Sequence, residues 1–189
     1  MDTQLARAVV VYCASSERCD FAYHEGARRL GGLLARDNRT VVYGGGRVGS
    51  MGALADGALA AGGRVIGVLP RFLKDLELAH DGLTELHVVE DMRARKHAML
   101  TRSQAVIALP GGSGTLEELL EAITLKRLGV YAGPIILVNM RNYYSPLLAM
   151  LANAIAERFM QEPSANIWQV VPTPDDVVPA LAAALRSQP

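Results

Sequence analysis

The amino-acid sequence predicts an α/β protein: a single doubly wound, mostly parallel sheet flanked by helices, in one domain over residues 1–189. Three observations support this fold class. Short runs of apolar, largely β-branched residues alternate with longer segments of helical periodicity. The joints between them are short, and two joints are rich in glycine. No repeat or low-complexity block interrupts the alternation, so a sheet with helices on both faces is expected.

In the first half of the chain, the expected strands are unalternating apolar runs, which is typical of strands covered on both faces. They fall at 8–12, 40–43, 65–69 and 86–89. Helical periodicity predicts helices at 21–36, from the glycine-rich turn at 44–52 to residue 61, and at 91–103. Pro70 ends the third strand, and the segment 71–83, which carries Glu77 and His80, is expected to be irregular.

The second half repeats the alternation and contains the stretch that matters most for function. Strands are expected at 105–109 and 135–139, with a short last strand at 170–171. Helices are expected at 115–128, 144–159 and 175–186, the last beginning at Thr173-Pro-Asp. The residues 105–121 read as strand, glycine-rich turn and helix start, which is the arrangement with which α/β proteins bind anions.

The turn after the strand at 105–109 combines three glycines with two hydroxyl side chains: Gly111, Gly112, Ser113, Gly114 and Thr115. The glycines allow a ligand to approach the backbone closely, and the first N–H groups of the helix have no intrahelical acceptor. A phosphate there would accept about four charge-assisted hydrogen bonds of roughly 1.5–3 kcal/mol each. That is sufficient for binding in the micromolar range.

The same residues are equally typical of a turn that binds nothing. Thr115 followed three residues later by Glu118 matches a capping box, with Thr115 as N-cap. Ser15 and Ser16, after the first strand, can likewise donate to a ligand or only cap the next helix. The sequence leaves both readings open for these residues.

Composition excludes several classes of function. Nineteen basic residues balance nineteen acidic ones, so there is no electrostatic footprint for nucleic acid or a membrane surface. No apolar run approaches the length of a membrane span and no signal peptide is recognisable. Cys13 and Cys19 form no disulfide or metal framework, and the four histidines lack ligand spacing. We expect a cytoplasmic protein without a metal.

A second glycine-rich turn, GGGRVGSMG at 44–52, matches G-x-G-x-x-G through Gly44, Gly46 and Gly49. It follows the second strand rather than the first, and the expected acidic residue about 20 positions later is missing, which disfavours NAD. A G-x-x-x-x-G-K-[ST] loop is also missing, which disfavours an ordinary NTPase. Both glycine turns are expected at the carboxyl ends of strands, one holding a phosphate and the other leaving room for a sugar or base.

The run MRARK at 92–96 supplies cations. Arg93 and Lys96 are three residues apart, and such a run is usually a solvated basic face. The alternative is that Arg95 reaches across to the loop after the fifth strand, where it holds an anion or orients Glu118.

Together, YGGGRVGSMG (43–52), MRARK (92–96) and PGGSGTLEE (110–118) resemble the Lonely Guy family of cytokinin riboside 5′-monophosphate phosphoribohydrolases, often mislabelled as lysine decarboxylases. The family signature is PGGxGTxxE with an upstream Arg-Lys pair, here Arg95-Lys96. Further similarity extends through most of the chain, including YCASS at 12–16 and NYYSPLL at 142–148.

The resemblance implies a Rossmann-like homodimer that needs no cofactor and hydrolyses the N-glycosidic bond of a nucleoside 5′-monophosphate. The products are a free base, adenine or an N6-modified adenine, and ribose 5-phosphate. The resemblance makes Arg95 and Glu118 the catalytic pair. The phosphate-binding residues are expected to be Gly111, Gly112, Ser113, Gly114 and Thr115. The other substrate-binding residues are expected to be Ser16, Gly45, Gly46, Met92 and Lys96.

Several positions depart from the family pattern and bear on the base pocket: Ala14, Arg93, Ala94, Leu125 and Arg141-Asn142. We expect Glu118 to be ionised beside Arg95 and to contact the ribose or the attacking water. Two alternatives remain. One is a nucleotide-binding module of the same fold without turnover. The other is a pyridoxal phosphate-dependent decarboxylase, for which the only lysines are Lys74, Lys96 and Lys126.

Overall fold

The computed structural model describes residues 7–74, 79–161 and 166–187, which form one sheet of seven parallel strands in the order β4-β3-β2-β1-β5-β6-β7. The strands are β1 (Ala8–Tyr12), β2 (Thr40–Tyr43), β3 (Val65–Pro70), β4 (Glu85–Val89), β5 (Ala105–Ala108), β6 (Ile135–Val138) and β7 (Trp168–Val171). The predicted fold class is therefore confirmed, with every strand pair parallel. The strand order reverses between β1 and β5, and ligands of doubly wound sheets bind at such a point.

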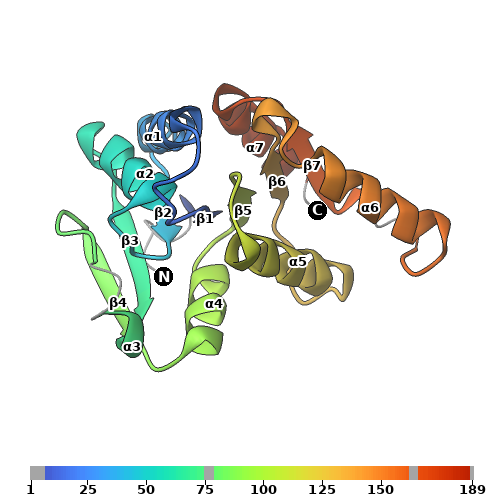
Figure 1. The fold of residues 1–189 in the computed structure, drawn as a ribbon, viewed down its shortest axis with the longest axis horizontal. Helices are drawn as coiled ribbons and strands as arrows, with labels where there is room; N and C mark the ends of the chain where they lie inside the picture. The colour runs from blue at the N-terminus through green and yellow to red at the C-terminus, as the bar shows by residue number, and fades with distance from the viewer. Residues whose placement is uncertain (1–6, 75–78, 162–165, 188–189) are drawn as a thin grey trace.

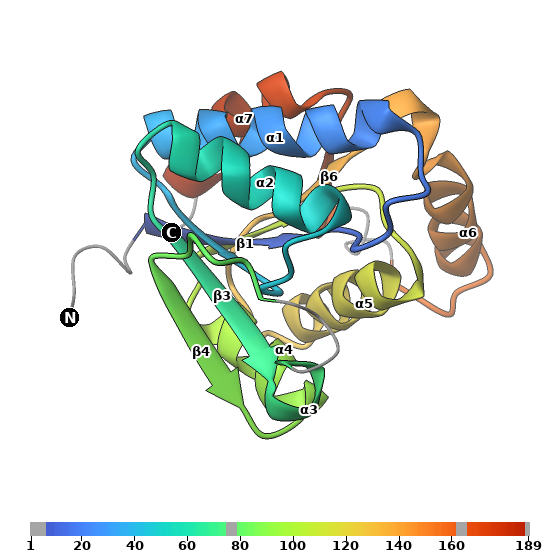
Figure 2. The same ribbon diagram turned by 60° about the vertical axis from the view of Figure 1, so that its left-hand side comes forward.

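The helices lie on both faces of the sheet (Figures 1 and 2). One face carries α1 (Phe21–Arg36), α2 (Gly49–Ala60) and α7 (Val177–Arg186). The other carries α4 (Met92–Thr101), α5 (Ser113–Arg127) and α6 (Ser145–Ala156). Two short 3-10 turns, η2 (Met140–Asn142) and η4 (Pro174–Asp176), join these elements. No helix within the described ranges is both long enough and apolar enough to span a bilayer.

The core is divided by the sheet into two apolar clusters. Along β1, Val9 and Val11 pack toward α1 and α2, whereas Val10 and Tyr12 pack toward α4 and α5. All four residues are buried, because a strand alternates its side chains between two covered faces. This explains why the central strands read as uninterrupted apolar runs.

Two expectations about local structure are wrong. The segment expected to be irregular begins with a short helix, α3 (Arg71–Lys74), while Glu77 lies outside the described residues. Thr115 is not the N-cap of α5, because the helix begins at Ser113 after Gly112, which offers no side-chain cap. The Thr115 side chain fills the space beside Gly111, whose added Cβ would meet Thr115 Oγ1 at 2.2 Å. A packed side chain in the first turn therefore replaces the expected capping box.

Candidate active site

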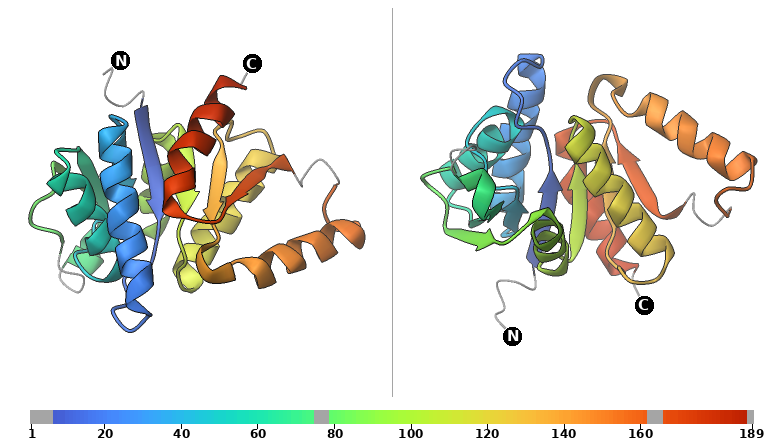
Figure 3. Two further views of the ribbon diagram at one scale, coloured as in Figure 1. Left: turned by 90° about the horizontal axis from the view of Figure 1, so that it is seen from above. Right: turned by 60° about the horizontal axis from the view of Figure 1, so that its bottom comes forward.

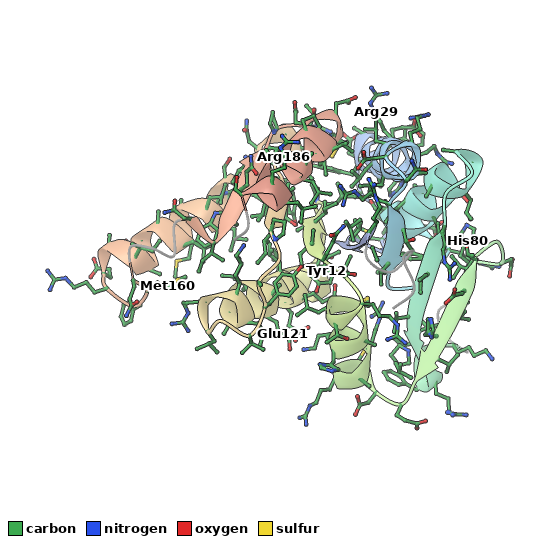
Figure 4. All side chains as sticks on the ribbon, turned by 180° about the vertical axis from the view of Figure 1, so that it is seen from behind. Tyr12, Arg29, His80, Glu121, Met160 and Arg186 are labelled. Atoms are coloured by element: carbon green, nitrogen blue, oxygen red, sulfur yellow. The ribbon has the colours of Figure 1, made fainter. Side chains whose placement is uncertain are left out.

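A cavity of about 300 Å³ opens where the strand order reverses, at the carboxyl end of β1. Its walls come from the loop after β1, from the starts of α2 and α4, and from the start of α5. The lining residues are Cys13, Ala14, Ser15, Ser16, Met51, Met92, Arg95, Gly112, Ser113, Gly114, Thr115, Glu117 and Glu118. Figure 4 labels one residue in each of two of these elements: Tyr12 is the last residue of β1, and Glu121 lies in α5.

The glycine turn at the start of α5 is open toward this cavity. A Cβ added to Gly112 or Gly114 would meet no atom within 4 Å, so the space beside the backbone is free for a ligand. The N–H groups of Ser113 and Gly114 have no acceptor among the described residues, as expected for a first helical turn. The turn thus combines unpaired donors with room for an anion.

Two tyrosines that sequence reasoning did not single out donate hydrogen bonds to backbone carbonyls of this turn and of the residue that directly follows β5. Tyr144 is fully buried, and its hydroxyl donates to the carbonyl of Leu109 at 2.7 Å. The Tyr143 hydroxyl donates to the carbonyl of Gly111. The signal for both residues was the similarity at 142–148, which does not by itself say what they contact.

The guanidinium of Arg95 is fixed by backbone carbonyls. Arg95 is 5% exposed; its Nε donates to the Val68 carbonyl at 3.1 Å and its Nη2 to the Gly44 carbonyl at 2.9 Å. A Cβ on Gly44 would lie 2.0 Å from Nη2, so any larger residue here must displace the guanidinium. Arg95 has no carboxylate oxygen of the described residues within 4.0 Å, and it therefore shares the cavity with Glu118 without a direct ion pair.

Glu118 is 8% exposed, and burial raises the pKa of its carboxyl to about 7. Arg95 and Lys96 lower this pKa, but loss of water outweighs them, and Glu117 and Glu121 raise it further. We expected Glu118 to be ionised beside Arg95; with a pKa of about 7, it is ionised in only part of the molecules at neutral pH, because burial outweighs the effect of Arg95. Such a carboxyl is suited to exchange a proton near neutral pH.

Cys13 also lines the cavity, but burial raises the pKa of its thiol far above neutrality. The thiol is therefore protonated at neutral pH and is a poor nucleophile.

Lys96 is not among the residues that line the cavity, although its partner Glu117 is. Its Nζ donates to Glu117 and, at 3.0 Å, pairs with Glu121, and the hydrogen bond to Glu117 is the main cause of its raised pKa. A Schiff base with pyridoxal phosphate requires a neutral amine, which these carboxylates oppose. Lys126, whose pKa is lowered by burial, donates to the Gly133 carbonyl at 2.8 Å near the end of α5, away from the cavity. Lys96 and Lys126 therefore do not fit that cofactor.

The glycine-rich turn at 44–52 contributes to the site differently from what was expected. Gly45 and Gly46 do not line the cavity. The Gly45 carbonyl accepts from the N–H of His80 at 3.0 Å, and the Gly46 carbonyl from the hydroxyl of Tyr43 at 3.1 Å. Gly44, which holds Arg95, supplies the functional contact of this turn instead.

Gly111 borders a second, smaller cavity of about 180 Å³ next to the first. Ser16 and Gly112 line both cavities, and Tyr23 and Tyr143 add aromatic surface to the smaller one. The described residues include no group of three or more His, Cys, Asp or Glu arranged to hold a metal ion.

Fold and site together define a Rossmann-like α/β protein with a cavity at the switch point of its sheet, to which an open glycine turn, an arginine and a buried glutamate contribute. Residues 51–181 match the family model described as possible lysine decarboxylase. A cytokinin riboside 5′-monophosphate phosphoribohydrolase of Rhodococcoides fascians is 45% identical over 155 residues, 82% of this chain and 78% of the relative. The phosphoribohydrolase LOG3 of Arabidopsis thaliana is 39% identical over 175 residues, 93% and 81% of the two chains. The chain belongs to this phosphoribohydrolase family.

Solved structures show the same fold. The molybdenum cofactor carrier protein of Chlamydomonas reinhardtii superposes with a TM-score of 0.74 at 21% identity, covering 95% of this chain and 98% of that one. The molybdenum cofactor binding protein of Rippkaea orientalis gives 0.72 at 24% identity, covering 94% and 96%. At these identities the likeness concerns the fold alone.

Proposed function

We propose that this protein hydrolyses the N-glycosidic bond of adenosine 5′-monophosphate or its N6-modified derivatives, releasing the free base and ribose 5-phosphate. The names of its relatives support the reaction. The observation that carries the proposal is that one cavity brings together the open turn at 112–115, Arg95 and Glu118. These are an anion-binding turn, a cation and a carboxyl group of near-neutral pKa.

The 5′-phosphate occupies the turn, where the N–H groups of Ser113 and Gly114 donate to its oxygens. Glu118 lies one helical turn further along α5, roughly 5.4 Å. That separation is comparable with the reach from a 5′-phosphate across the sugar, which supports a contact between the carboxylate and the ribose.

Cleavage builds positive charge on the ribose as its bond to the base lengthens, as in other glycosidic cleavages. The ionised carboxylate of Glu118 stabilises that charge and accepts a proton from the attacking water. The water oxygen bonds to the anomeric carbon and the bond to the base breaks. The departing nitrogen of the base takes a proton from solvent, and Glu118 releases to solvent the proton that it accepted from the water. Arg95 supplies a fixed positive charge in the cavity. In the proposed reaction it faces the departing base, and it lowers the pKa of Glu118.

The departures from the family pattern largely avoid the cavity. Arg93, Ala94 and Leu125 are not among its lining residues, whereas Ala14 lines both the main and the smaller cavity. A change of base preference relative to the family is therefore most readily traced to Ala14.

The experiment that tests the proposal is incubation with AMP and with an N6-substituted AMP, followed by chromatography for free base. We expect free base and ribose 5-phosphate in equal amounts from at least one nucleotide. Adenosine, which lacks the phosphate, is the control and is expected to react far more slowly. Nucleotide binding without any release of base would instead identify a binding module without turnover.

We also propose that the protein is a cytoplasmic homodimer. The family likeness suggests the dimer. Leu120 of α5 and Leu128, which directly follows α5, are 39% and 61% exposed, whereas Leu119 and Ile123 lie in the core. Exposed apolar side chains on a helix that also lines the site are typical of a subunit contact. Sedimentation of the purified protein tests this; a monomer at micromolar concentration would contradict it.

A further inference from the structure

A separate cavity of about 360 Å³ lies at the amino ends of the strands, the edge of the sheet opposite the active site. Figure 3, left, shows the amino end of β1 beside the N label. The cavity is lined by Arg7, Ala35, Asn38, Arg39, Thr40, Gly62, Gly63 and Arg64. Three of these residues are arginines, and no acidic side chain of the described chain lines the cavity.

The three arginines are placed by the sheet itself. Arg7 directly precedes β1, Arg39 directly precedes β2, and Arg64 directly precedes β3. These strands are neighbours, and the register pairs Ala8 with Thr40 and Val41 with Val65. The parallel register therefore brings three guanidinium groups that are far apart in the sequence to one edge.

Arg39 is the central member of this cluster. It is 8% exposed, and its Nε donates to Asp37 Oδ2 at 2.7 Å. Its two terminal nitrogens have no acceptor among the described residues. These nitrogens are not fully buried. Among the described residues, the fully buried side-chain nitrogen and oxygen atoms that lack a hydrogen-bond partner are Ser50 Oγ and Tyr131 Oη, and no atom of Arg39 is among them. The terminal nitrogens of Arg39 therefore face the cavity with donors unused.

The other two arginines are oriented by carboxylates outside the cavity. Arg7 donates to the Asp37 carbonyl at 2.9 Å and lies 3.8 Å from Asp37 Oδ2. Arg64 pairs with Glu85. Asp37 and Glu85 are not among the residues that line the cavity, whereas the three arginines are. The ion pairs fix the guanidinium groups in place.

We propose that this cavity is a second ligand site that binds a small phosphate-bearing anion, distinct from the nucleotide site. Guanidinium groups donate in a planar fork that matches phosphate oxygens, and a desolvated arginine with unused donors gains most from such a partner. The volume is at the lower end of the roughly 300–1,000 Å³ typical of small-molecule sites, which fits a pyrophosphate or a sugar phosphate.

The test is titration of the full-length protein with inorganic pyrophosphate at constant ionic strength, followed by backbone amide NMR. Gly62 and Gly63 report on the proposed site, whereas Gly112 and Gly114 report on the nucleotide site. We expect saturable shifts at Gly62 and Gly63. Arg39→Gln is expected to weaken that response about tenfold, because it removes charge-assisted donors, and to leave the response at Gly112 unchanged.

Because Arg39 is buried, Arg7→Gln serves as a second variant; its side chain is 51% exposed and its loss should not prevent folding. It is also expected to weaken the response at Gly62 and Gly63. Arg127→Gln, an exposed arginine that lines neither cavity, removes the same charge and should change nothing. Two results would overturn the proposal. One is saturable shifts confined to Gly112 and Gly114. The other is a response at Gly62 and Gly63 that is equal in the wild type, Arg7→Gln and Arg127→Gln.

Discussion

Replacing Glu118 by glutamine is expected to abolish turnover and, at the same time, to stabilise the fold. The proposed reaction needs the ionised carboxylate, which glutamine cannot supply. The same carboxylate is unfavourable to the folded state, because it is 8% exposed and loses water on folding. A change that removes the charge but keeps the size of the side chain therefore separates function from stability.

The size of the stability effect follows from the pKa. Burial raises the pKa of Glu118 from its ordinary 4.5 to about 7. At about 1.36 kcal/mol per pH unit, that difference corresponds to about 3 kcal/mol. The folded state binds the extra proton, so the wild-type protein loses stability as the pH rises from 4.5 through about 7. Glutamine does not titrate, so Glu118→Gln should be more stable by about 3 kcal/mol at pH 8 and nearly unchanged at pH 4.

The assay is thermal or urea unfolding of both proteins at pH 4, 6 and 8, with kcat/KM measured on AMP or its N6-substituted form. For a chain of this size, 3 kcal/mol corresponds to a rise in Tm of roughly 6–12 °C. Glu157→Gln is the control, since Glu157 is exposed, lines neither cavity and is not among the groups that shift the pKa of Glu118. Equal stability of wild type and Glu118→Gln at pH 8, or full turnover in the variant, would refute the reasoning. In the wild type, kcat/KM should rise with pH through about 7 as Glu118 ionises.

Three glycine substitutions give further tests. Gly112→Ala adds a methyl group to open space, so it should leave Tm nearly unchanged while weakening AMP binding at least about tenfold in titration calorimetry. Gly111→Ala should instead lower Tm, because its Cβ meets Thr115 Oγ1 at 2.2 Å. The opposite pattern would show that the turn is not part of the binding site. Gly44→Ala should displace the guanidinium of Arg95, which lies 2.0 Å from the added Cβ, and lower kcat about 100-fold without touching the substrate, so wild-type kcat in a folded variant would argue against a catalytic role for Arg95.

The sequence was sufficient to predict the fold, because the signals that determine it are local. Buried parallel strands must be apolar on both faces, and helices must repeat with their own period, so the alternation is visible along the chain. The glycine turn at 111–114 was recognisable for the same reason, because a strand, a turn and a helix start are contiguous. The family followed from motifs that are specific in combination, and the comparisons confirm it.

Contacts between distant segments were decided only by the tertiary structure. The partners of Arg95 are carbonyls at Gly44 and Val68, and no side-chain pattern in the sequence marks a backbone acceptor. The charge state of Glu118 depends on how much water the surrounding segments exclude, which is a property of packing rather than of spacing. Likewise, the arginines before β1, β2 and β3 form a cluster only because the parallel register aligns the strand starts. Burial and strand register result from the folding of the whole chain. The amino-acid sequence can therefore indicate which residues contribute to the site, but not which atoms they contact.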